Sequence, residues 1–260
     1  MSSLSASIEG IGFWASGMPS WQAARDYMHG GALPTGVPAR PTPELLPPNE
    51  RRRAPETVAV ALEVARAACV AAGRDPCSLP SVFASTHGDL AITDYMCATL
   101  AADPRAISPT RFHNSVHNAA AGYWTIGNGC TRPATAISSH AASFAQGLLE
   151  ALVQLAAGAE AVLLAAFDAA SPGPLAAVSP SIGLLGGALV LAQPHTGALR
   201  MRATLVDSDA PPAHGRLARL IGGNAMAPML PLFQALASGD DLACLHAGPL
   251  RTLRVEIAHV

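Results

Sequence analysis

Apolar residues are arranged in runs whose lengths and endings predict alternating strands and helices. The segment 56–72 follows Pro55 and precedes Gly73, and such flanking residues are typical of a helix. The segment 141–157 predicts a second helix, because its few polar residues are spaced four apart and share one narrow face. Further helices are predicted at 89–101 and 228–237, and strands at 7–13, 81–86, 134–138, 161–167, 186–192, 198–206 and 250–257.

The order of these elements predicts how they assemble. Strands that alternate with buried helices are typical of a layered α/β fold, with a largely parallel sheet covered on both faces. The consecutive strands after residue 161 predict that the sheet ends in an antiparallel hairpin. Seven prolines in the segment 30–55 predict a long irregular loop that wraps one domain.

Composition narrows the classes of function. Half of the 260 residues are hydrophobic, 13% are charged and the formal net charge is −2, which excludes disorder and disfavours nucleic-acid binding. All 16 basic residues are arginine, so a Schiff-base lysine and the lysine of a nucleotide-binding P-loop are excluded. The five cysteines are scattered without a CxxC pair, which argues against a zinc site or a disulfide framework.

No segment has the pattern of a signal peptide or a membrane span. The N-terminal residues include Glu9 and lack a basic region before an apolar stretch. The most apolar stretch, 151–170, is interrupted by Gln154, Glu160 and Asp168. We therefore expect a cytoplasmic protein that neither inserts into a membrane nor binds nucleic acid.

The richest polar segment, residues 108–124, places histidines and asparagines beside a run of small residues. His113 and His117 are four apart, which on a helix would put both rings on one face, as in many metal sites. No carboxylate or third ligand lies nearby, so no metal is expected. Two interpretations remain: an irregular loop whose side chains satisfy backbone groups, or a surface that faces a substrate.

A second candidate is the segment 135–147, where a predicted strand passes abruptly into a helix. A helix N-terminus offers backbone donors to a thiolate or an oxyanion, and Ser138, Ser139 and His140 lie at this one. Adjacent strand residues point to opposite faces, and the G-x-S-x-G motif of serine hydrolases is absent. The pattern therefore gives little support to a serine nucleophile.

These segments, with the strand that follows them, resemble the N-terminal half of β-ketoacyl synthases. The resemblance runs in order through FHNSVHNAAAGYW, TAISSHAASFAQGLLEAL and GAEAVLLAAFDA, and it covers residues 7–206. In that order, these stretches are similar to the family's NSxxNAAAG segment, to its nucleophile turn with the helix that follows, and to its DAVLAGG-like strand. It implies a thiolase-like α/β fold in one domain, 1–260, with a ketosynthase-like core at 1–206 and a reduced C-terminal part at 207–260.

The departures from the family pattern concern catalysis. When Ala142 and Ser143 are aligned with the family's Ala-Ser, Ala141 takes the position of the nucleophilic cysteine. The methyl side chain of alanine cannot form a thioester. Cys130 precedes the strand and cannot replace it. The family's catalytic lysine and histidines belong to a second half for which the remaining chain is too short. The resemblance thus implies no catalytic residue, cofactor or metal.

Cysteine-less relatives of this kind pair with a complete ketosynthase and are called chain-length factors. Short proteins with an HNSVHN-like stretch resemble the ketosynthase-like subunits of aryl-polyene and xanthomonadin-type pigment systems, which use fatty-acid or polyketide-type chemistry. The implied role is a non-catalytic chain-length factor in a heterodimer with a full-length ketosynthase. The residues expected to line the acyl tunnel or the interface are Phe112, His113, Asn114, His117, Asn118, Tyr123, Trp124, His140 and Phe144. The bulky aromatic members of this set are candidates for the stop that limits chain growth.

Two other functions remain open. A stand-alone enzyme would decarboxylate a malonyl thioester, with His140 or His117 assisting and backbone donors holding the enolate. A binding module would present a basic patch to an acidic acyl carrier protein, and the segment 51–53 is a run of three arginines. The apolar composition and the narrow polar face of the 141–157 helix favour a covering partner, or else reflect biased base composition.

Overall fold

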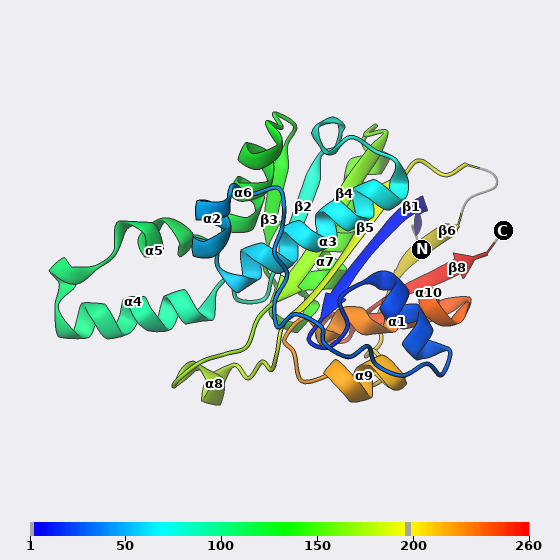
Figure 1. The fold of residues 1–260 in the computed structure, drawn as a ribbon. Coiled ribbons are helices and arrows are strands. Elements are labelled where there is room, and N and C mark those ends of the chain that lie inside the picture. Colours follow the sequence, from blue (N-terminus) through cyan, green and yellow to red (C-terminus); the bar gives the residue numbers. More distant parts are fainter. Residues whose placement is uncertain (1–2, 196–198, 260) are drawn as a thin grey trace.

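The computed structural model describes residues 3–195 and 199–259, which form an eight-stranded sheet with helices on both faces (Figure 1). The order across the sheet is β3-β2-β4-β5-β1-β6-β8-β7. The strands are β1 (Ser3–Ala15), β2 (Ser81–Ala84), β3 (Ala134–Ile137), β4 (Ala161–Asp168), β5 (Leu185–Ala192), β6 (Arg200–Val206), β7 (Leu242–Gly248) and β8 (Arg251–Ala258). The α-helices are α1 (Trp21–Met28), α2 (Pro48–Arg53), α3 (Glu56–Ala72), α4 (Leu90–Ala102), α5 (Pro109–Asn114), α6 (Ala119–Asn128), α7 (Ser143–Ala156), α8 (Leu175–Val178), α9 (Arg216–Ile221) and α10 (Leu230–Ser238). Short 3₁₀ turns are η1 (Pro76–Ser78), η2 (Pro104–Ala106), η3 (His140–Ala142) and η4 (Ala227–Met229).

The strand directions differ from the expectation of a largely parallel sheet, which is wrong. Among the described strands, β3–β2 and β2–β4 are parallel and the other five pairings are antiparallel. A parallel neighbour needs a long crossover, and α7 supplies one between β3 and β4. Only the four-residue helix α8 lies between β4 and β5, which pair antiparallel in the middle of the sheet. The hairpin that ends the sheet is formed by β7 and β8 instead.

Most elements predicted from local pattern are present. The helix α3 begins and ends where predicted, and Gly73 adopts the left-handed conformation (φ 64°) that terminates it. The predicted loop 30–55 is irregular except for α2, whereas α9 and β7 were not predicted. The strand predicted at 198–206 is β6, and its first position, 198, lies outside the described residues.

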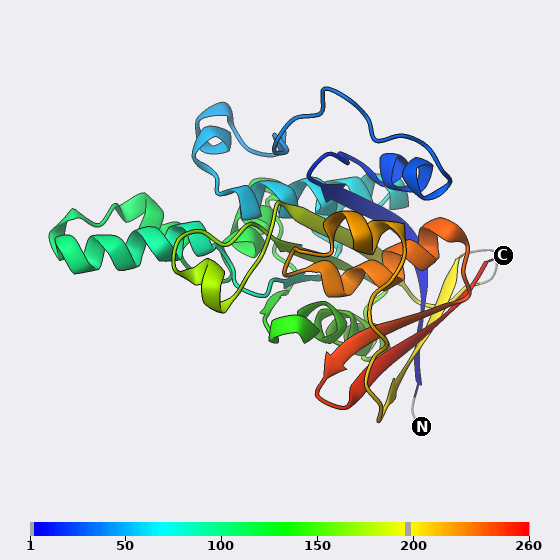
Figure 2. The same ribbon diagram turned by 90° about the horizontal axis from the view of Figure 1, so that it is seen from below.

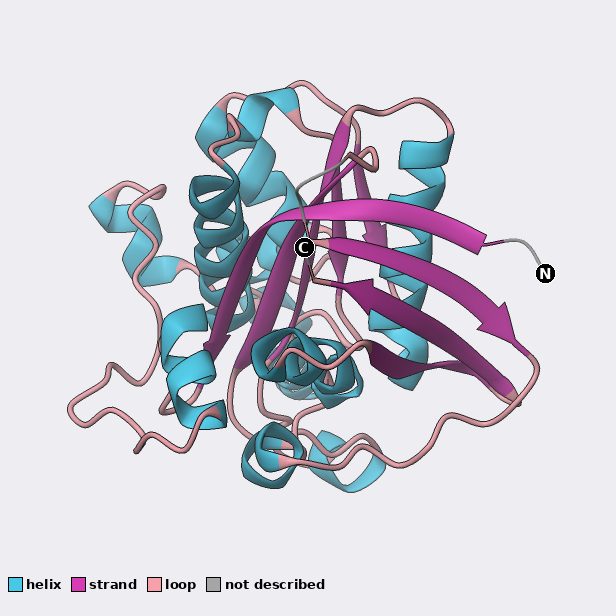
Figure 3. Ribbon diagram, turned by 90° about the vertical axis from the view of Figure 1, so that its right-hand side faces the viewer, coloured by secondary structure: helices cyan, strands magenta, loops and turns pink. Residues whose placement is uncertain are grey.

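Two apolar cores lie on opposite faces of the sheet. Residues from α3 and α6 fill one core, and residues from α7 and α10 fill the other, so that β2, β4, β5 and β1 stand between two helical layers (Figure 3). The strands β6, β8 and β7 contribute to the second core only. Phe13 and Trp14 are adjacent on β1 and belong to different cores, because successive strand residues point to opposite faces. The buried strands β4 and β5 contribute to both cores, which explains their continuous apolar sequences.

The helix α7 buries its apolar surface within this chain. Eight of its fourteen residues are buried, and they face the sheet. The polar positions between them are the half-buried Gln146, Glu150 and Gln154. The narrow polar face of this helix is therefore explained by the chain's own core and does not by itself indicate a partner.

The helices α4 and α5 project from the body of the molecule as an arm (Figures 1 and 2). The sequence of α4 is apolar, yet Ile92 is its only buried residue among those described. An apolar helix with so little contact to its own chain leaves a surface for another molecule to cover. Neither α4 nor any other helix within 3–195 and 199–259 is long and apolar enough to cross a membrane.

Candidate functional site

Three polar segments come together where the parallel strands β2, β3 and β4 end. Both β3 and β4 run parallel to β2, so the residues that follow these strands lie side by side. We refer to residues 85–87, residues 138–143 and Asp168 as the strand-end cluster. The cluster contains Ser138, Ser139 and His140, which the sequence singled out.

Asp168 is fully buried at the centre of this cluster. Its carboxylate accepts hydrogen bonds from Ser85 Oγ at 2.7 Å, from the Thr86 N–H at 3.0 Å and from the His87 N–H at 3.3 Å. Burial raises the pKa of Asp168, and the hydrogen bonds from Ser85 and Thr86 oppose that rise. The carboxylate therefore fixes the loop after β2 against the end of β4. Sequence reasoning missed this role, although a lone acid at the end of an apolar strand was a signal.

The chain turns sharply between β3 and α7, and His140 lies at the turn. Its φ of 47° is in the left-handed region, which residues other than glycine rarely adopt outside tight turns and functional sites. Ser143 Oγ donates to the His140 carbonyl at 2.7 Å and accepts from the Ser139 N–H at 2.8 Å, which holds the turn. The exposed His140 is thus the strained residue. Ala141, which the resemblance places at the nucleophile position, follows it and is also exposed.

Serine side chains in this region make structural contacts. Ser138 Oγ donates to the Thr86 carbonyl at 3.0 Å and joins the ends of β3 and β2. His87 Nε2 lies 2.5 Å from Ser179 Oγ, a contact that the sequence did not reveal. The other ring nitrogen of His87, Nδ1, is buried and has no hydrogen-bond partner in the described part of the chain. No carboxylate among residues 3–195 and 199–259 makes a hydrogen bond to this ring, so the pair lacks the third member of a catalytic triad there.

The segment 108–124 forms the helices α5 and α6, with a break at 115–118, and the expectation of an irregular loop is wrong. Pro109 occupies the first turn of α5, where proline costs no hydrogen bond. Ser108 caps the same helix by accepting from the Arg111 N–H. Pro109 therefore begins a helix instead of interrupting one.

The two histidines of this segment lie in different surroundings. His113 is exposed on α5, whereas His117 lies in the break and places Nε2 3.0 Å from the Ser85 carbonyl oxygen. Asn114 is buried and accepts a hydrogen bond from the Tyr123 hydroxyl at 3.1 Å. The described residues contain no group of three or more His, Cys, Asp or Glu side chains suited to a metal ion.

An apolar hollow of about 570 Å³ lies beside α2, α5 and α6. We call it the α5–α6 hollow, and its lining includes Leu46, Phe112, His113, Val116, Asn118, Tyr123 and Ile126. Phe112 is 61% exposed and Ile126 is 80% exposed, which is unusual for side chains of this size. Trp124 and Phe144 lie instead in the cores on opposite faces of the sheet. The structure thus divides the candidate residues among the hollow, the strand-end cluster and the cores.

A second hollow, of about 560 Å³, is lined by several arginines, including Arg40, Arg52, Arg53 and Arg111. Arg53 also lines the α5–α6 hollow, so the two hollows adjoin. The Arg111 guanidinium lies 4.0 Å from the centre of the Tyr95 ring, which fixes its position. Glu56 and Asp89 also line this hollow, so the four arginines leave it a net positive charge that is suited to an anionic group.

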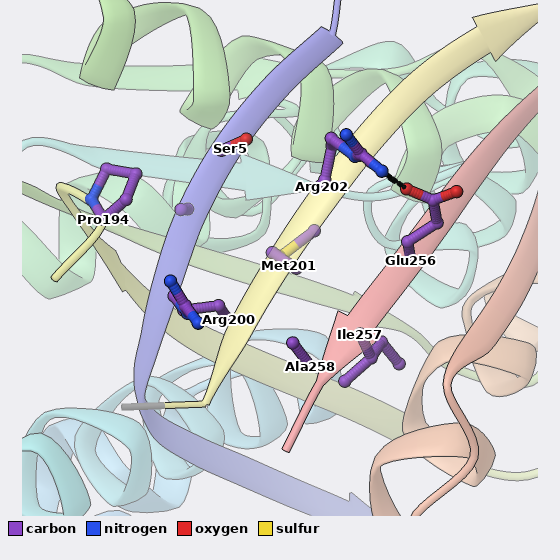
Figure 4. Close-up of a pocket in the computed structure, with 9 residues that line it drawn as sticks. Ser5, Pro194, Arg200, Met201, Arg202, Glu256, Ile257 and Ala258 are labelled. Atoms are coloured by element: carbon purple, nitrogen blue, oxygen red, sulfur yellow. Dashed lines mark hydrogen bonds and ion pairs between the residues drawn. The ribbon is translucent and has the colours of Figure 1, made fainter. Parts of the chain in front are cut away.

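A third hollow lies over β1, β6 and β8 (Figure 4). The Glu256 carboxylate there accepts from Arg202 at 2.6 Å and contacts Arg254 at 2.7 Å. The hydrogen bond from Arg202, with the charges of both arginines, lowers the pKa of Glu256. Because this carboxylate is already paired, the third hollow offers no candidate acid or base.

Comparisons with known proteins agree with this arrangement. Residues 21–229 match the family model of the β-ketoacyl synthase N-terminal domain. None of the curated proteins matches the chain.

Solved structures that resemble the chain share its fold over nearly the whole length. One is the ketosynthase ApeO in complex with its chain length factor ApeC from Xenorhabdus doucetiae (TM-score 0.75, 23% identity, 97% of this chain and 99% of that one). Another is AntDE:AntF, a type II PKS acyl-carrier protein in complex with its ketosynthase bound to the hexaketide (0.72, 13%, 98% and 99%). A third is the ishigamide ketosynthase/chain length factor (0.69, 16%, 97% and 99%).

These likenesses confirm the thiolase-like α/β fold expected from the resemblance. Because the family model spans most of its length, the chain belongs to the β-ketoacyl synthase family.

Proposed function

We propose that the chain is a non-catalytic chain-length factor, which pairs with a complete ketosynthase in the biosynthesis of aryl-polyene-type pigments. Two of the structures that it resembles are ketosynthases with their chain length factors. In both cases the match covers 99% of the other chain, so the chains compared have nearly the same length.

The observation that carries the proposal is the turn after β3. It presents His140 and Ala141, and neither side chain can form the thioester that a condensing enzyme needs. Cys130 precedes β3, at the opposite end of that strand, where its sulfur contacts Cys77. The chain thus combines the family's fold with a turn that holds no thiol.

The surface near β3 is suited to a large partner. As the last strand of the sheet, β3 pairs with β2 on one side only and leaves its other edge open. The arm formed by α4 and α5 and the α5–α6 hollow add exposed apolar side chains, among them Phe112, Val116 and Ile126. Extensive apolar surfaces of this kind are typical of obligate interfaces.

The α5–α6 hollow supports a role in limiting chain length. Its volume of about 570 Å³ is in the range of small-molecule sites, and Phe112 and Tyr123 line it. An acyl chain that grew into such a space would stop where an aromatic ring fills it. The partner's surface would close the open side of the hollow.

Co-expression with the full-length ketosynthase from the same genomic neighbourhood tests the proposal. Size-exclusion chromatography with mass detection is expected to give a stable one-to-one complex, and this chain alone is expected to aggregate. A well-behaved monomer or homodimer that does not bind the ketosynthase would overturn the proposal.

A second candidate is a docking module for an acyl carrier protein, favoured by the arginine-lined hollow. Carrier proteins are acidic, and Arg40, Arg52, Arg53 and Arg111 surround one hollow. The double substitution Arg52→Glu with Arg53→Glu is expected to weaken carrier-protein binding severalfold in calorimetry at low salt. The matched control is Arg200→Glu on β6, which should leave the affinity unchanged. Equal affinity of all three proteins would contradict docking at this hollow.

A further inference from the structure

Two thiols meet beside the N-terminal ends of β2 and β3, at the opposite end of these strands from the strand-end cluster. Cys77 lies in η1, just before β2, and Cys130 lies between α6 and β3. The Cys130 thiol donates to Cys77 Sγ at 3.1 Å, and the Cys77 thiol donates to the Asn128 carbonyl at 2.8 Å. The two sulfurs are therefore already in direct contact.

The backbone holds both cysteines in place. The Asp75 carboxylate caps η1 by accepting from the Cys77 N–H at 3.0 Å. The Cys130 N–H donates to the Thr125 carbonyl at 2.8 Å at the end of α6. Because both segments are anchored, the thiols meet without any movement of a helix or strand.

We propose that Cys77 and Cys130 form a reversible intramolecular disulfide, which makes the N-terminal ends of β2 and β3 a redox modification site. A disulfide requires the sulfurs to approach to about 2.05 Å, so the pair must close by only about 1 Å. Both side chains are partly exposed, which leaves them accessible to a small oxidant of the hydroperoxide class. The bond would join the segment that enters β2 to the segment that enters β3.

The chemistry balances with hydrogen peroxide as the oxidant. The Cys77 thiolate attacks one peroxide oxygen, the O–O bond breaks, and hydroxide leaves as Cys77 becomes a sulfenic acid. The Cys130 sulfur then attacks the Cys77 sulfur, forms the S–S bond and displaces the hydroxyl group as water. Two thiols and one peroxide thus give one disulfide and two waters. A reduced dithiol reverses the step by exchange.

The surroundings of Cys130 affect the pH dependence of the second step, in which its sulfur attacks Cys77. Burial is the largest of the causes that raise the pKa of Cys130 to about 12, and the neighbouring Cys77 and Asp75 add to the rise. Thiolates react and thiols do not, so the disulfide should form slowly near neutral pH and faster as the pH rises. Such a pair would respond to sustained oxidation and not to brief exposure.

The test counts free thiols in a Cys97→Ser protein. Cys97 is exposed on α4, and its removal eliminates the thiol that is most accessible for disulfides between molecules. After hydrogen peroxide, denaturation and alkylation, mass spectrometry is expected to find two labels in place of four, with a cross-linked peptide that joins positions 77 and 130. Dithiothreitol should restore four labels. Oxidation should raise Tm by roughly 5 °C, because the bond restricts the unfolded chain.

Single substitutions separate this pair from the other cysteines. Adding Cys77→Ser or Cys130→Ser should abolish both the bridge and the rise in Tm, whereas adding Cys244→Ser should leave them intact. Four labels after oxidation would overturn the proposal. A bridge that maps to the buried Cys69 would also overturn it.

Discussion

Two glycines of β1 determine how closely α3 packs on the sheet. A Cβ atom at Gly12 would lie 2.0 Å from the Val64 carbonyl oxygen, and one at Gly10 would lie 2.1 Å from the Ala68 carbonyl oxygen. Real Cβ atoms do not approach a backbone oxygen so closely, and the backbone of a helix cannot move aside alone. The glycines are therefore required by packing, not by backbone conformation.

Gly12→Ala is expected to destabilise the protein by about 3 kcal/mol or more, because α3 must shift away from β1 and its buried side chains lose contacts. The matched control is Gly122→Ala in α6, where a Cβ meets nothing within 4 Å. Alanine there should stabilise the helix by about 0.5–1 kcal/mol. Urea unfolding of both variants checks the pair, and equal effects would contradict this account of the β1–α3 contact.

The buried carboxyl group of Asp168 makes stability depend on pH. Its pKa is raised in the folded chain above an ordinary value of 3.8, so the folded chain retains the proton over a range where the unfolded chain releases it. Across that range the free energy of unfolding should fall as the pH rises, starting near pH 4. Asp168→Asn should flatten this slope in a series of urea titrations. An unchanged slope would show that the carboxyl does not titrate differently in the two states.

At the scale of elements, features that depend on neighbouring residues were predicted correctly, whereas features that depend on distant residues were not. Pro55 and Gly73 fixed the bounds of α3 because capping depends on neighbouring residues. The direction of β5 depends on the whole connection from β4, so the parallel sheet was predicted wrongly. The hydrogen bond of Asp168 with Ser85 joins residues 83 positions apart, and no local pattern reveals it. Sequence order alone therefore located the polar segments but not the contacts between them.

The open edge of β3 is a place where a strand of the ketosynthase could pair. The Pro133 carbonyl accepts from the N–H of Ser81 in β2, and the Ile137 carbonyl accepts from the N–H of Ser85 directly after it. By alternation, the N–H of Ala136 therefore faces away from β2. Ala136→Pro should therefore preserve the pairing with β2 and block any strand added at the open edge. The complex with the ketosynthase should be lost in size-exclusion chromatography, while Ala136→Val, which retains the N–H, should still bind. A proline variant that still binds would place the interface elsewhere.

At the scale of the whole molecule, the chain has a well-packed interior and an exposed apolar surface. The chain's own helices cover both faces of β2, β4, β5 and β1, whereas the arm and the α5–α6 hollow leave apolar side chains exposed. A partner that covers this surface would form the last wall of the hollow. The acyl tunnel of the proposed complex would then belong to both chains.

Phe112→Ala is expected to lengthen the product of the reconstituted ketosynthase complex, because the ring lines the α5–α6 hollow and its removal extends the space. Mass spectrometry of the released polyene should show a shift to longer chains by one or more two-carbon units. Val153→Ala, at an exposed position of α7, is the matched control and should leave the product unchanged. Identical product lengths for Phe112→Ala, Tyr123→Ala and the control would show that this hollow does not hold the chain.

The position of β1 between β5 and β6 has a consequence for synthesis of the protein. β1 leaves the ribosome well before either of its sheet neighbours, since Ser7 pairs with Ala192 of β5, 185 positions later. At ordinary rates of translation this interval is roughly 10–40 s. Throughout it, β1 must stay without its sheet neighbours and without aggregating, so chaperone capture of the nascent β1 segment is expected to govern the yield of folded protein.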